Sequence, residues 1–517
     1  TRQADAFAIT PEQLVSSLEF YRGPSSILSG ATPPGGAANI ITKKPLPQAF
    51  TRLEATYDSH EQRELAADYN SGQQQLAGLP VSFRFNAVGE DSNSFRDEVE
   101  RENIALAPVA TLQLSPDTRM TLEANIIDWE ATDDRGLPLV GSDDGEAAAD
   151  RFETSDFLLG TTDEINDREQ QRYMLDLSHQ WRENISTNLQ ATYGETTRSQ
   201  FAVFPVQFDA STDTLARAHF GTEDEFESTD IRLDTLFELD TGILTHEALA
   251  AVQYRGFKRT DNFTSFVSPA DTVNVRSPES DKPFLADSGP AGGVQGDNES
   301  RELLLQDSVS VNQGILEGGR LMLGTRYIDF NEETDESLDE NEWVSRLGLG
   351  YTPPALPLTT FYGSFSESFN TQSGTTAGGG SVGPSEGEQW ELGVKSEILD
   401  GGLTLTLAYF QLENTNVAVA DPNNPGASLA VGRQENDGVE LEAVGNITSN
   451  LQVQGQYTRN DSVIRDDPQR QGNELQLAPE NSASLWLRYD VPERRVTGDL
   501  AVFGGLSHLG RRYTDID

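Results

Sequence analysis

The residues of this sequence that could do chemistry are scattered histidines and a large excess of carboxylates. No histidine spacing matches a metal site. The five histidines are His60, His179, His219, His246 and His508. No nucleophile-elbow, phosphate-binding or dinucleotide-binding motif lies in a strand–turn–helix context. Cysteine is absent, which excludes disulfides and thiolate metal sites. We therefore expect no catalytic site, no metal site and no cofactor, and a protein that is not an enzyme.

The charge of the chain restricts its partners. Against 84 acidic residues stand 37 lysines and arginines, which gives a formal net charge of -47 over 517 residues. Nucleic acid is thereby excluded as an expected partner, because binding a phosphate backbone needs Lys and Arg to displace counterions. The carboxylates crowd residues 133–167, 223–227 and 329–342. These stretches either recruit cations, including divalent ions that bridge to lipopolysaccharide, or simply keep the surface solvated, and we favour the second reading.

Two further loop features have a functional and a plain interpretation. Residues 142–145 (SDDG) could be described as a calcium loop, but they lack the spacing of an EF-hand. Several aromatic residues of the long polar stretches could contact a ligand or lie at a membrane interface, and the second reading is the plainer one. They are Phe201, Phe204, Phe208, Phe263 and Phe266.

Two glutamates can be placed by the alternation of side chains along strands. In residues 390–394, Trp390 and Leu392 share one face, so Glu391 points from the opposite face. In the same way Glu440 lies opposite Val439. Both glutamates precede a short turn by a similar distance, so we expect them at similar height on the polar side of one sheet.

The elements that position these residues are strands, because period-two alternation runs from about residue 51 to the end. Residues 81–87 are typical: apolar and polar side chains alternate, as they do at 185–193, 451–458 and 482–490. No apolar stretch approaches the roughly 20 residues of a spanning helix. A membrane strand needs only about 10 residues with alternate apolar positions, so the mean hydropathy of -0.50 is compatible with a barrel.

The connections between strands favour a membrane barrel over a soluble sandwich. Short turns are predicted at 115–118, 182–184, 241–244, 312–319, 353–357, 398–402, 446–450 and 491–497. Longer polar stretches lie between them at 130–170, 197–228, 259–300, 331–342, 370–387, 413–436 and 461–481. Outer-membrane barrels alternate tight periplasmic turns with long outer loops, whereas a sandwich has no reason to keep this parity. The predicted fold class is an all-β transmembrane barrel.

Counting from residue 52 to about residue 508 gives roughly 19 strands. Bacterial single-chain barrels close with an even number, and an open edge cannot face lipid. We therefore expect a barrel that stops before closure, with about three more strands needed for a 22-stranded barrel.

Residues 11–45 (PEQLVSSLEFYRGPSSILSGATPPGGAANIITKKP) have a different pattern. Pro11 begins a short helical turn, and residues 18–20 look like part of a strand. Gly23 and Pro24 force a change of direction and start another turn, which Gly30 ends. Residues 33–36 form a rigid bend before a strand at 39–42. This is a compact α+β fragment.

This run resembles the end of the plug domain of TonB-dependent receptors, in particular of the ferric-siderophore class. The motifs that carry the resemblance are RGP at 22–24, S-x-L-x-G at 26–30, PGG at 34–36 and NIITKKP at 39–45. The motif residues singled out are Gly23, Pro24, Gly30, Gly35, Gly36 and Asn39. Residues 388–397, 405–417 and 438–447 are similar to barrel segments of the same class.

The resemblance implies two regions and a function. Residues 1–48 would be the C-terminal part of a plug domain, and residues 49–517 a barrel truncated before closure. It implies a ferric-siderophore importer in the outer membrane of a Gram-negative bacterium, surrounded by lipid and lipopolysaccharide. TonB would open it through a box that precedes this sequence. An importer of another ligand, such as cobalamin or an oligosaccharide, stays open as an alternative. So does a passive porin-like barrel, although such a pore needs no plug.

The resemblance also implies a charge contact between the two regions. In related receptors, glutamates at the positions of Glu391 and Glu440 pair with plug arginines, and Arg22 of the RGP motif matches one of these arginines. We therefore expect Arg22 to lie close to both carboxylates.

Overall fold

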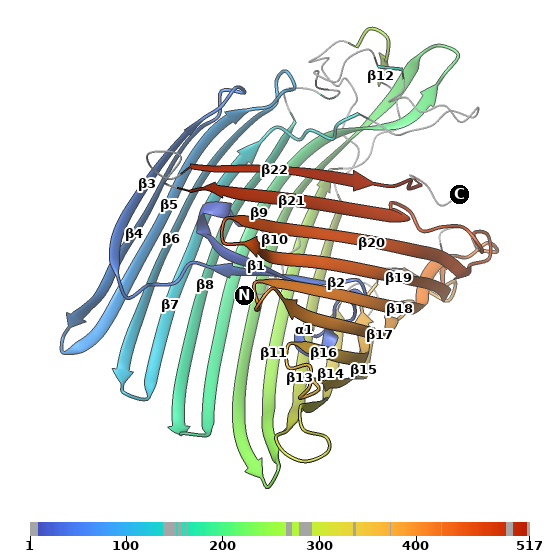
Figure 1. Cartoon of the computed structure of the whole chain (residues 1–517). Helices are drawn as coiled ribbons and strands as arrows, with labels where there is room; N and C mark the ends of the chain where they lie inside the picture. The colour runs from blue at the N-terminus through green and yellow to red at the C-terminus, as the bar shows by residue number, and fades with distance from the viewer. Residues whose placement is uncertain are drawn as a thin grey trace.

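The computed structural model describes residues 9–137, 151–152, 158, 160, 164–264, 271–278, 292–333, 338–372, 374–424, 427–492 and 500–513. This part of the chain consists of a small plug segment, residues 9–48, and a long antiparallel sheet that curls around it (Figure 1). No helix in the described residues is long and apolar enough to cross a membrane.

The plug segment is a two-stranded sheet with two short helical turns. Its elements are η1 (Glu12–Leu14), β1 (Val15–Arg22), α1 (Ser26–Ser29) and β2 (Gly36–Thr42). Pro11 precedes η1, and Gly30, with a φ of 66°, ends α1, as the sequence predicts. β1 and β2 pair antiparallel from Val15↔Thr42 to Arg22↔Gly36. The chain then passes directly into the barrel, whose first strand begins at Ala49.

Twenty strands of the described residues form the barrel sheet. Their bounds are β3 (Ala49–Tyr57), β4 (Arg63–Leu76), β5 (Leu79–Asn93), β6 (Glu100–Ser115), β7 (Thr118–Ala131), β8 (Ile165–Arg182), β9 (Ile185–Asp209), β10 (Thr214–Thr241), β11 (Leu244–Thr264), β12 (Asp271–Asn274), β13 (Gly292–Val311), β14 (Gly319–Glu333), β15 (Leu338–Tyr351), β16 (Thr359–Asn370), β17 (Ser385–Ile398), β18 (Leu403–Ala420), β19 (Ser428–Thr448), β20 (Leu451–Asp466), β21 (Asn481–Val491) and β22 (Leu500–Leu509). The four-residue β12 pairs with the start of β10, so 19 strands make the wall, as the sequence predicts.

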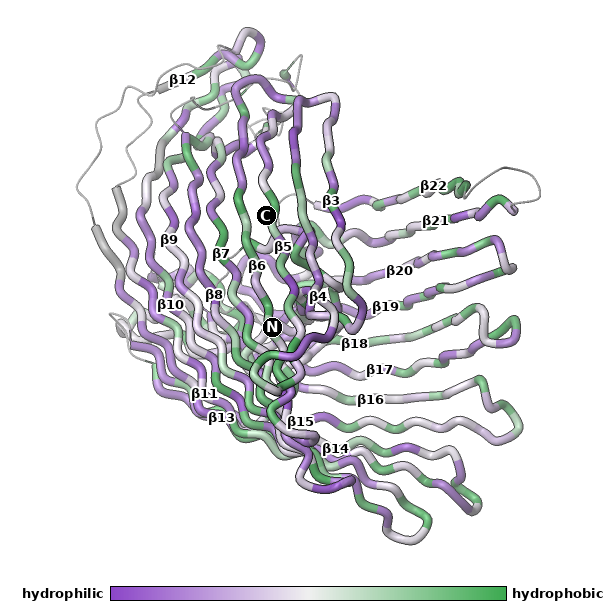
Figure 2. The backbone as a smooth tube through the Cα atoms, turned by 90° about the vertical axis from the view of Figure 1, so that its left-hand side faces the viewer, coloured by the Kyte–Doolittle hydropathy of each residue, from purple (hydrophilic) through white to green (hydrophobic). Residues whose placement is uncertain are grey.

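The strand order returns from β22 to β3 in a ring, but among the described residues no ladder of paired residues joins these two strands. A barrel that stops before closure therefore stays a prediction. With 19 alternating wall strands, β3 and β22 run in the same direction and cannot continue an antiparallel ladder. They cross steeply where they meet (Figures 1 and 2). The curl of a twisted sheet brings the two end strands together. The total of 22 strands stays a prediction.

The short turns lie where they are predicted, for example between Ser115 and Thr118 and between Arg182 and Ile185. The long polar stretch predicted at 197–228 is wrong, because β9 and β10 continue through it and meet in a tight turn at 210–213. β10 has 28 residues and spans about 90 Å, far more than the roughly 10 residues that cross a bilayer. Charged residues such as Glu223 and Glu225 are exposed on these strands, which explains why the sequence looks like a loop there.

The two faces of the wall differ as the alternation predicts. Phe83 and Phe85 are exposed on the outside, whereas Arg84 and Asn86, which follow them in turn, are buried inside. Trp390 and Leu392 are likewise exposed outside. Figure 2 shows hydrophobic and hydrophilic residues alternating along the strands. The wall therefore presents an apolar outer face and encloses a polar interior that holds the plug segment.

The difference between the two faces predicts what a charge on the outer one would do. Leu441 is exposed among apolar outward side chains of β19, so Leu441→Arg should destabilise the protein in lipid by about 2–4 kcal/mol. Ser449→Arg, in the exposed turn of the same hairpin, should cost at most about 1 kcal/mol. Denaturant titration in lipid vesicles, read by heat-modifiable gel mobility, measures both. Equal costs for the two variants would contradict the assigned faces.

Candidate functional site: the interface between plug segment and barrel

The predicted contact between Arg22 and Glu440 is present. Arg22 ends β1, Glu440 projects inward from β19, and the Arg22 Nη1 to Glu440 Oε2 distance is 2.8 Å. The pair is open to solvent, with exposed side-chain fractions of 55% for Arg22 and 27% for Glu440. Such exposed pairs contribute little to stability. The contact therefore orients the end of β1 without fixing it strongly.

Among the described residues Glu391 makes no hydrogen bond or ion pair with Arg22, and the expectation that Arg22 lies close to both carboxylates stays a prediction for Glu391. Its carboxylate accepts hydrogen bonds from the Tyr362 hydroxyl at 2.7 Å and from the Gln389 side-chain amide at 3.1 Å. Both donors are wall residues, on the neighbouring strand and two positions along the same strand. The hydrogen bonds that Glu391 accepts thus come from wall residues. Among the described residues the ion-pair partner of Arg22 is Glu440.

The glycines of the plug motif have specific steric roles. A side chain on Gly23 (φ 73°) would collide with Gln389, and one on Gly30 (φ 66°) with the guanidinium of Arg255. Gly36 has a φ of 121° and lies against the carbonyl of Tyr21. The positive φ at all three positions, together with the lack of space for a Cβ, requires glycine.

The other three motif residues have simpler surroundings. Pro24 is buried at the turn after β1. Gly35 has open space around it, so nothing at that position demands glycine. The side-chain amide of Asn39 donates a hydrogen bond of 3.0 Å to Glu19, its cross-strand partner in β1.

A charge cluster lies where the plug segment joins the barrel, and we did not single it out from the sequence. Lys44 pairs with Glu123 of β7, whose side chain is 1% exposed. Lys43 lies 3.5 Å from Asp68, which also binds Arg84 at 2.7 Å. Both lysines belong to the NIITKKP motif, and alternation places Glu123 inward. These two signals together could have identified the contact.

The backbone of the junction, residues 43–48, is held as well. Arg84 donates a hydrogen bond of 2.8 Å to the carbonyl of Lys44. The fully buried Asn70 accepts from the Leu46 amide and donates to the Leu46 and Gln48 carbonyls. The junction is therefore fixed to β4, β5 and β7 by charges and by buried hydrogen bonds.

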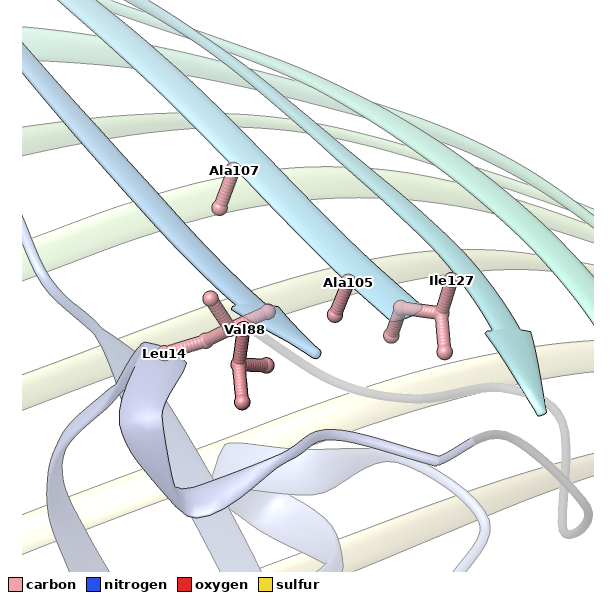
Figure 3. Close-up of a cluster of buried hydrophobic side chains, with 5 residues drawn as sticks. All are labelled: Leu14, Val88, Ala105, Ala107 and Ile127. Atoms are coloured by element: carbon pink, nitrogen blue, oxygen red, sulfur yellow. The ribbon is translucent and has the colours of Figure 1, made fainter. Parts of the chain in front are cut away.

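An apolar contact supports the same side of the plug segment. Leu14, from η1, packs against Val88, Ala105, Ala107 and Ile127, which project inward from β5, β6 and β7 (Figure 3). All five side chains are buried. An apolar patch on the inner wall of a polar lumen pairs with an apolar residue of the plug segment, so it determines where η1 docks.

A second buried cluster surrounds α1 on the opposite wall. Arg326 of β14 pairs with Glu302 of β13, and each side chain is only 1% exposed. Arg326 also donates a hydrogen bond of 2.9 Å to the carbonyl of Ile27 in α1. Arg255 lies 3.3 Å from Glu302 and packs against Gly30. Alternation alone puts Arg326 inside, but nothing in the sequence indicates that it meets α1.

α1 and the residues after it also bind β16 through neutral groups. The Phe369 amide donates to the Ser26 hydroxyl at 3.1 Å, and the Thr32 amide donates to the Phe369 carbonyl at 2.8 Å. Ile27 packs against Ala251 and Leu304. The plug segment thus contacts both sides of the lumen with different chemistry on each side.

One row of inward side chains crosses five neighbouring strands, from β7 to β11. It lies beyond Leu14, toward the end of the barrel that carries the longer connections between strands, here called the mouth. In register order the row is Trp129, Arg168, Arg198, Asp224 and Asp261. The Arg168 guanidinium lies over the Trp129 ring at 5.1 Å, and Arg198 Nε donates to Asp224 at 2.7 Å. The row therefore offers indole and guanidinium groups to the space above the plug segment.

A cavity of about 480 Å³ opens next to this row at the mouth. Trp129, His60, Phe95, Arg101 and Asn166 are among its lining residues. Within the described residues no cluster of His, Cys, Asp or Glu could hold a metal ion.

The loop features singled out in the sequence have different outcomes. Residues 142–145 and Phe266 lie outside the described part, and the side chain of Phe263 is not described either. Phe208, a candidate ligand contact from the sequence, is instead buried with Leu215, Val273 and Val275 in the outer extension of β9, β10 and β12.

The chain is similar to receptors of known identity over nearly its whole length. The family described as TonB dependent receptor-like, beta-barrel, matches residues 108–517. The metal-pseudopaline receptor CntO of Pseudomonas aeruginosa is 28% identical over 97% of this chain and 71% of its own length. The ferrioxamine B receptor of Salmonella typhimurium is 27% identical over 96% of this chain and 70% of its own.

Solved structures give the same fold. The ferric preacinetobactin receptor BauA of Acinetobacter baumannii superposes with a TM-score of 0.87 at 18% identity, covering 98% of this chain and 76% of that one. The barrel, the segment inside it and the family match over about four fifths of the sequence agree. The chain belongs to the TonB-dependent receptor family.

Proposed function

We propose that this protein imports ferric siderophores across the outer membrane of a Gram-negative bacterium, with TonB supplying the energy that opens it. The observation that carries the proposal is the plug segment inside the barrel, held by Arg22, Lys43, Lys44 and α1. A passive pore has no use for such a segment. Two relatives are named as receptors of ferrioxamine B and of ferrichrome, which supports a siderophore as ligand.

The faces of the wall support the membrane location. Exposed apolar side chains on the outside suit lipid, and antiparallel ladders join the neighbouring wall strands from β3 through to β22. Lipid and lipopolysaccharide are therefore the proposed surroundings of the outer face. The siderophore is cargo in this scheme, and no resident cofactor is part of it.

The row above the plug segment is the proposed place of ligand contact. A ferric siderophore surrounds its metal with oxygen atoms, and guanidinium and indole N–H groups donate well to such oxygens. Arg168 and Trp129 already lie together there, beside the cavity at the mouth. Chemically, the site binds and positions a chelate and does not transform it.

A second candidate belongs to the same class of transport. The relative that is 28% identical is named for a metal–pseudopaline complex, which favours a metal-loaded chelator other than a ferric siderophore. Cobalamin and oligosaccharides stay as further alternatives that the same binding experiment separates.

Tryptophan fluorescence tests the ligand directly. All five tryptophans lie in described residues, and Trp129 faces the mouth, whereas Trp181, Trp343, Trp390 and Trp486 are exposed elsewhere. A ferric siderophore should quench the protein's fluorescence saturably, and Trp129→Phe should remove most of the quenching. Trp181→Phe, the matched control, should keep it. Quenching by metal–pseudopaline, cobalamin or a glycan, with none by any ferric siderophore, would overturn the siderophore assignment.

Import requires the plug segment to move, so the exposed ion pair between Arg22 and Glu440 should contribute little to stability. We expect a double-mutant cycle of Arg22→Gln and Glu440→Gln to give a coupling free energy of about 0.2–1 kcal/mol, because both side chains contact solvent. Denaturant unfolding in detergent measures it. A coupling free energy well above this range of about 0.2–1 kcal/mol would show that the pair is a principal lock.

A further inference from the structure

The plug segment carries its charges unevenly toward the two sides of the lumen. Lys43 and Lys44 face β4, β5 and β7, where they meet Asp68 and the buried Glu123. On the other side the segment offers the solvent-exposed Arg22 and otherwise neutral groups, namely the Ile27 carbonyl, the Ser26 hydroxyl and the Thr32 amide. The barrel groups that would lose a partner if the plug segment separated from the wall therefore differ between the two sides.

Separation of the plug segment from the wall at the lysine side would cost electrostatic free energy in the barrel. Without Lys44, Glu123 keeps a hydrogen bond from Asn125 and the field of the buried Arg172, but it loses its ion-pair partner. A buried charge that loses its partner is strongly unfavourable. Asn70 would also lose its bonds to Leu46 and Gln48.

Separation at the α1 side leaves the buried charges paired. Arg326 would lose one hydrogen bond to a neutral carbonyl and keep both Glu302 and Gln253, which belong to the wall. Glu302 also keeps Arg255. The ion pairs on this side are internal to the barrel, so they persist whether α1 is docked or not.

We propose that the plug segment is hinged at residues 43–48 and latched at α1, so that it opens from the β11–β16 side while staying attached to β4–β7. Arg326 is then a positioning residue: its pairing with Glu302 keeps the guanidinium aimed at the Ile27 carbonyl and allows α1 to dock and leave reversibly. A role for this opening in import rests on the proposed function, whereas the asymmetry of opening does not.

Thiol labelling measures the opening, because the chain has no cysteine of its own. Ser29 in α1 and Thr42 beside the hinge are buried to the same degree, at 4% and 3% exposure. In detergent, without ligand or TonB, we expect the Ser29→Cys variant to react at least about tenfold faster than the Thr42→Cys variant, since labelling of buried sites follows local opening. Ala107→Cys, on the inner wall beside Leu14, reports undocking of η1 and should react as slowly as the Thr42→Cys variant.

Two further substitutions, each combined with the cysteine variants as a background, distinguish the hinge from the latch. Arg326→Met should speed labelling at position 29 at least about tenfold and leave position 42 within about twofold, while Lys44→Met should do the reverse. Equal labelling rates at 29 and 42 without either background substitution would overturn the proposal, since the segment would then move as one body. That comparison stands even where a background variant folds poorly. A failure of siderophore binding would leave these rates unaffected, so the two proposals fail separately.

Discussion

Buried charges inside the barrel must have partners, and this constraint governs how the plug segment and the wall fit together. The wall strands direct one set of side chains outward and the other set inward, which places Glu123, Glu302 and Arg326 in the interior. Desolvated charges of this kind are tolerated only when paired. Glu302 and Arg326 satisfy each other within the wall, whereas Glu123 is paired by Lys44 of the plug segment.

This division of partners explains how one segment can be both held and released. A gate fixed by buried ion pairs on every side would need several charges to be stripped at once. Here neutral groups of the plug segment meet the wall around α1, beside the solvent-exposed Arg22, and the ion pair with a buried wall charge lies at the junction with β3, where the chain is covalently continuous with the wall. The apolar contact of Leu14 is on the ionic side and strengthens it. The row of Trp129 and Arg168, the proposed place of ligand contact, lies beyond that side, so the two proposals together place binding over the part of the plug segment that moves least.

Much of this architecture was predictable from local pattern. Alternation assigned the inward positions of Arg84 and Glu440, and the short turns followed from the interruptions of that pattern. The length of β9 and β10 was not predictable, because charged residues on strands that extend beyond a membrane resemble loop residues in the sequence. The meeting of β22 with β3 depends on the curl of the whole sheet. Likewise, Glu391 has the same parity as Glu440, but its bond to Tyr362 depends on a neighbouring strand and left Arg22 with one partner among the described residues.

The central claim is that residues 9–48 occupy the lumen against specific positions of the wall. A side chain on Gly387 of β17 would have its Cβ 2.5 Å from the Cβ of Pro34, closer than the roughly 3.5–4.5 Å of a disulfide, so a shift of about 1 Å in the double variant Pro34→Cys, Gly387→Cys brings two thiols into bonding range. Under mild oxidation we expect an intramolecular disulfide to form nearly completely, seen as a gel shift and a loss of two hydrogens by mass. The pair Pro34→Cys, Asn86→Cys, which places the second thiol on the inner face of β5, should stay reduced. No disulfide in the first pair, or an equal yield in both, would contradict the docked plug segment.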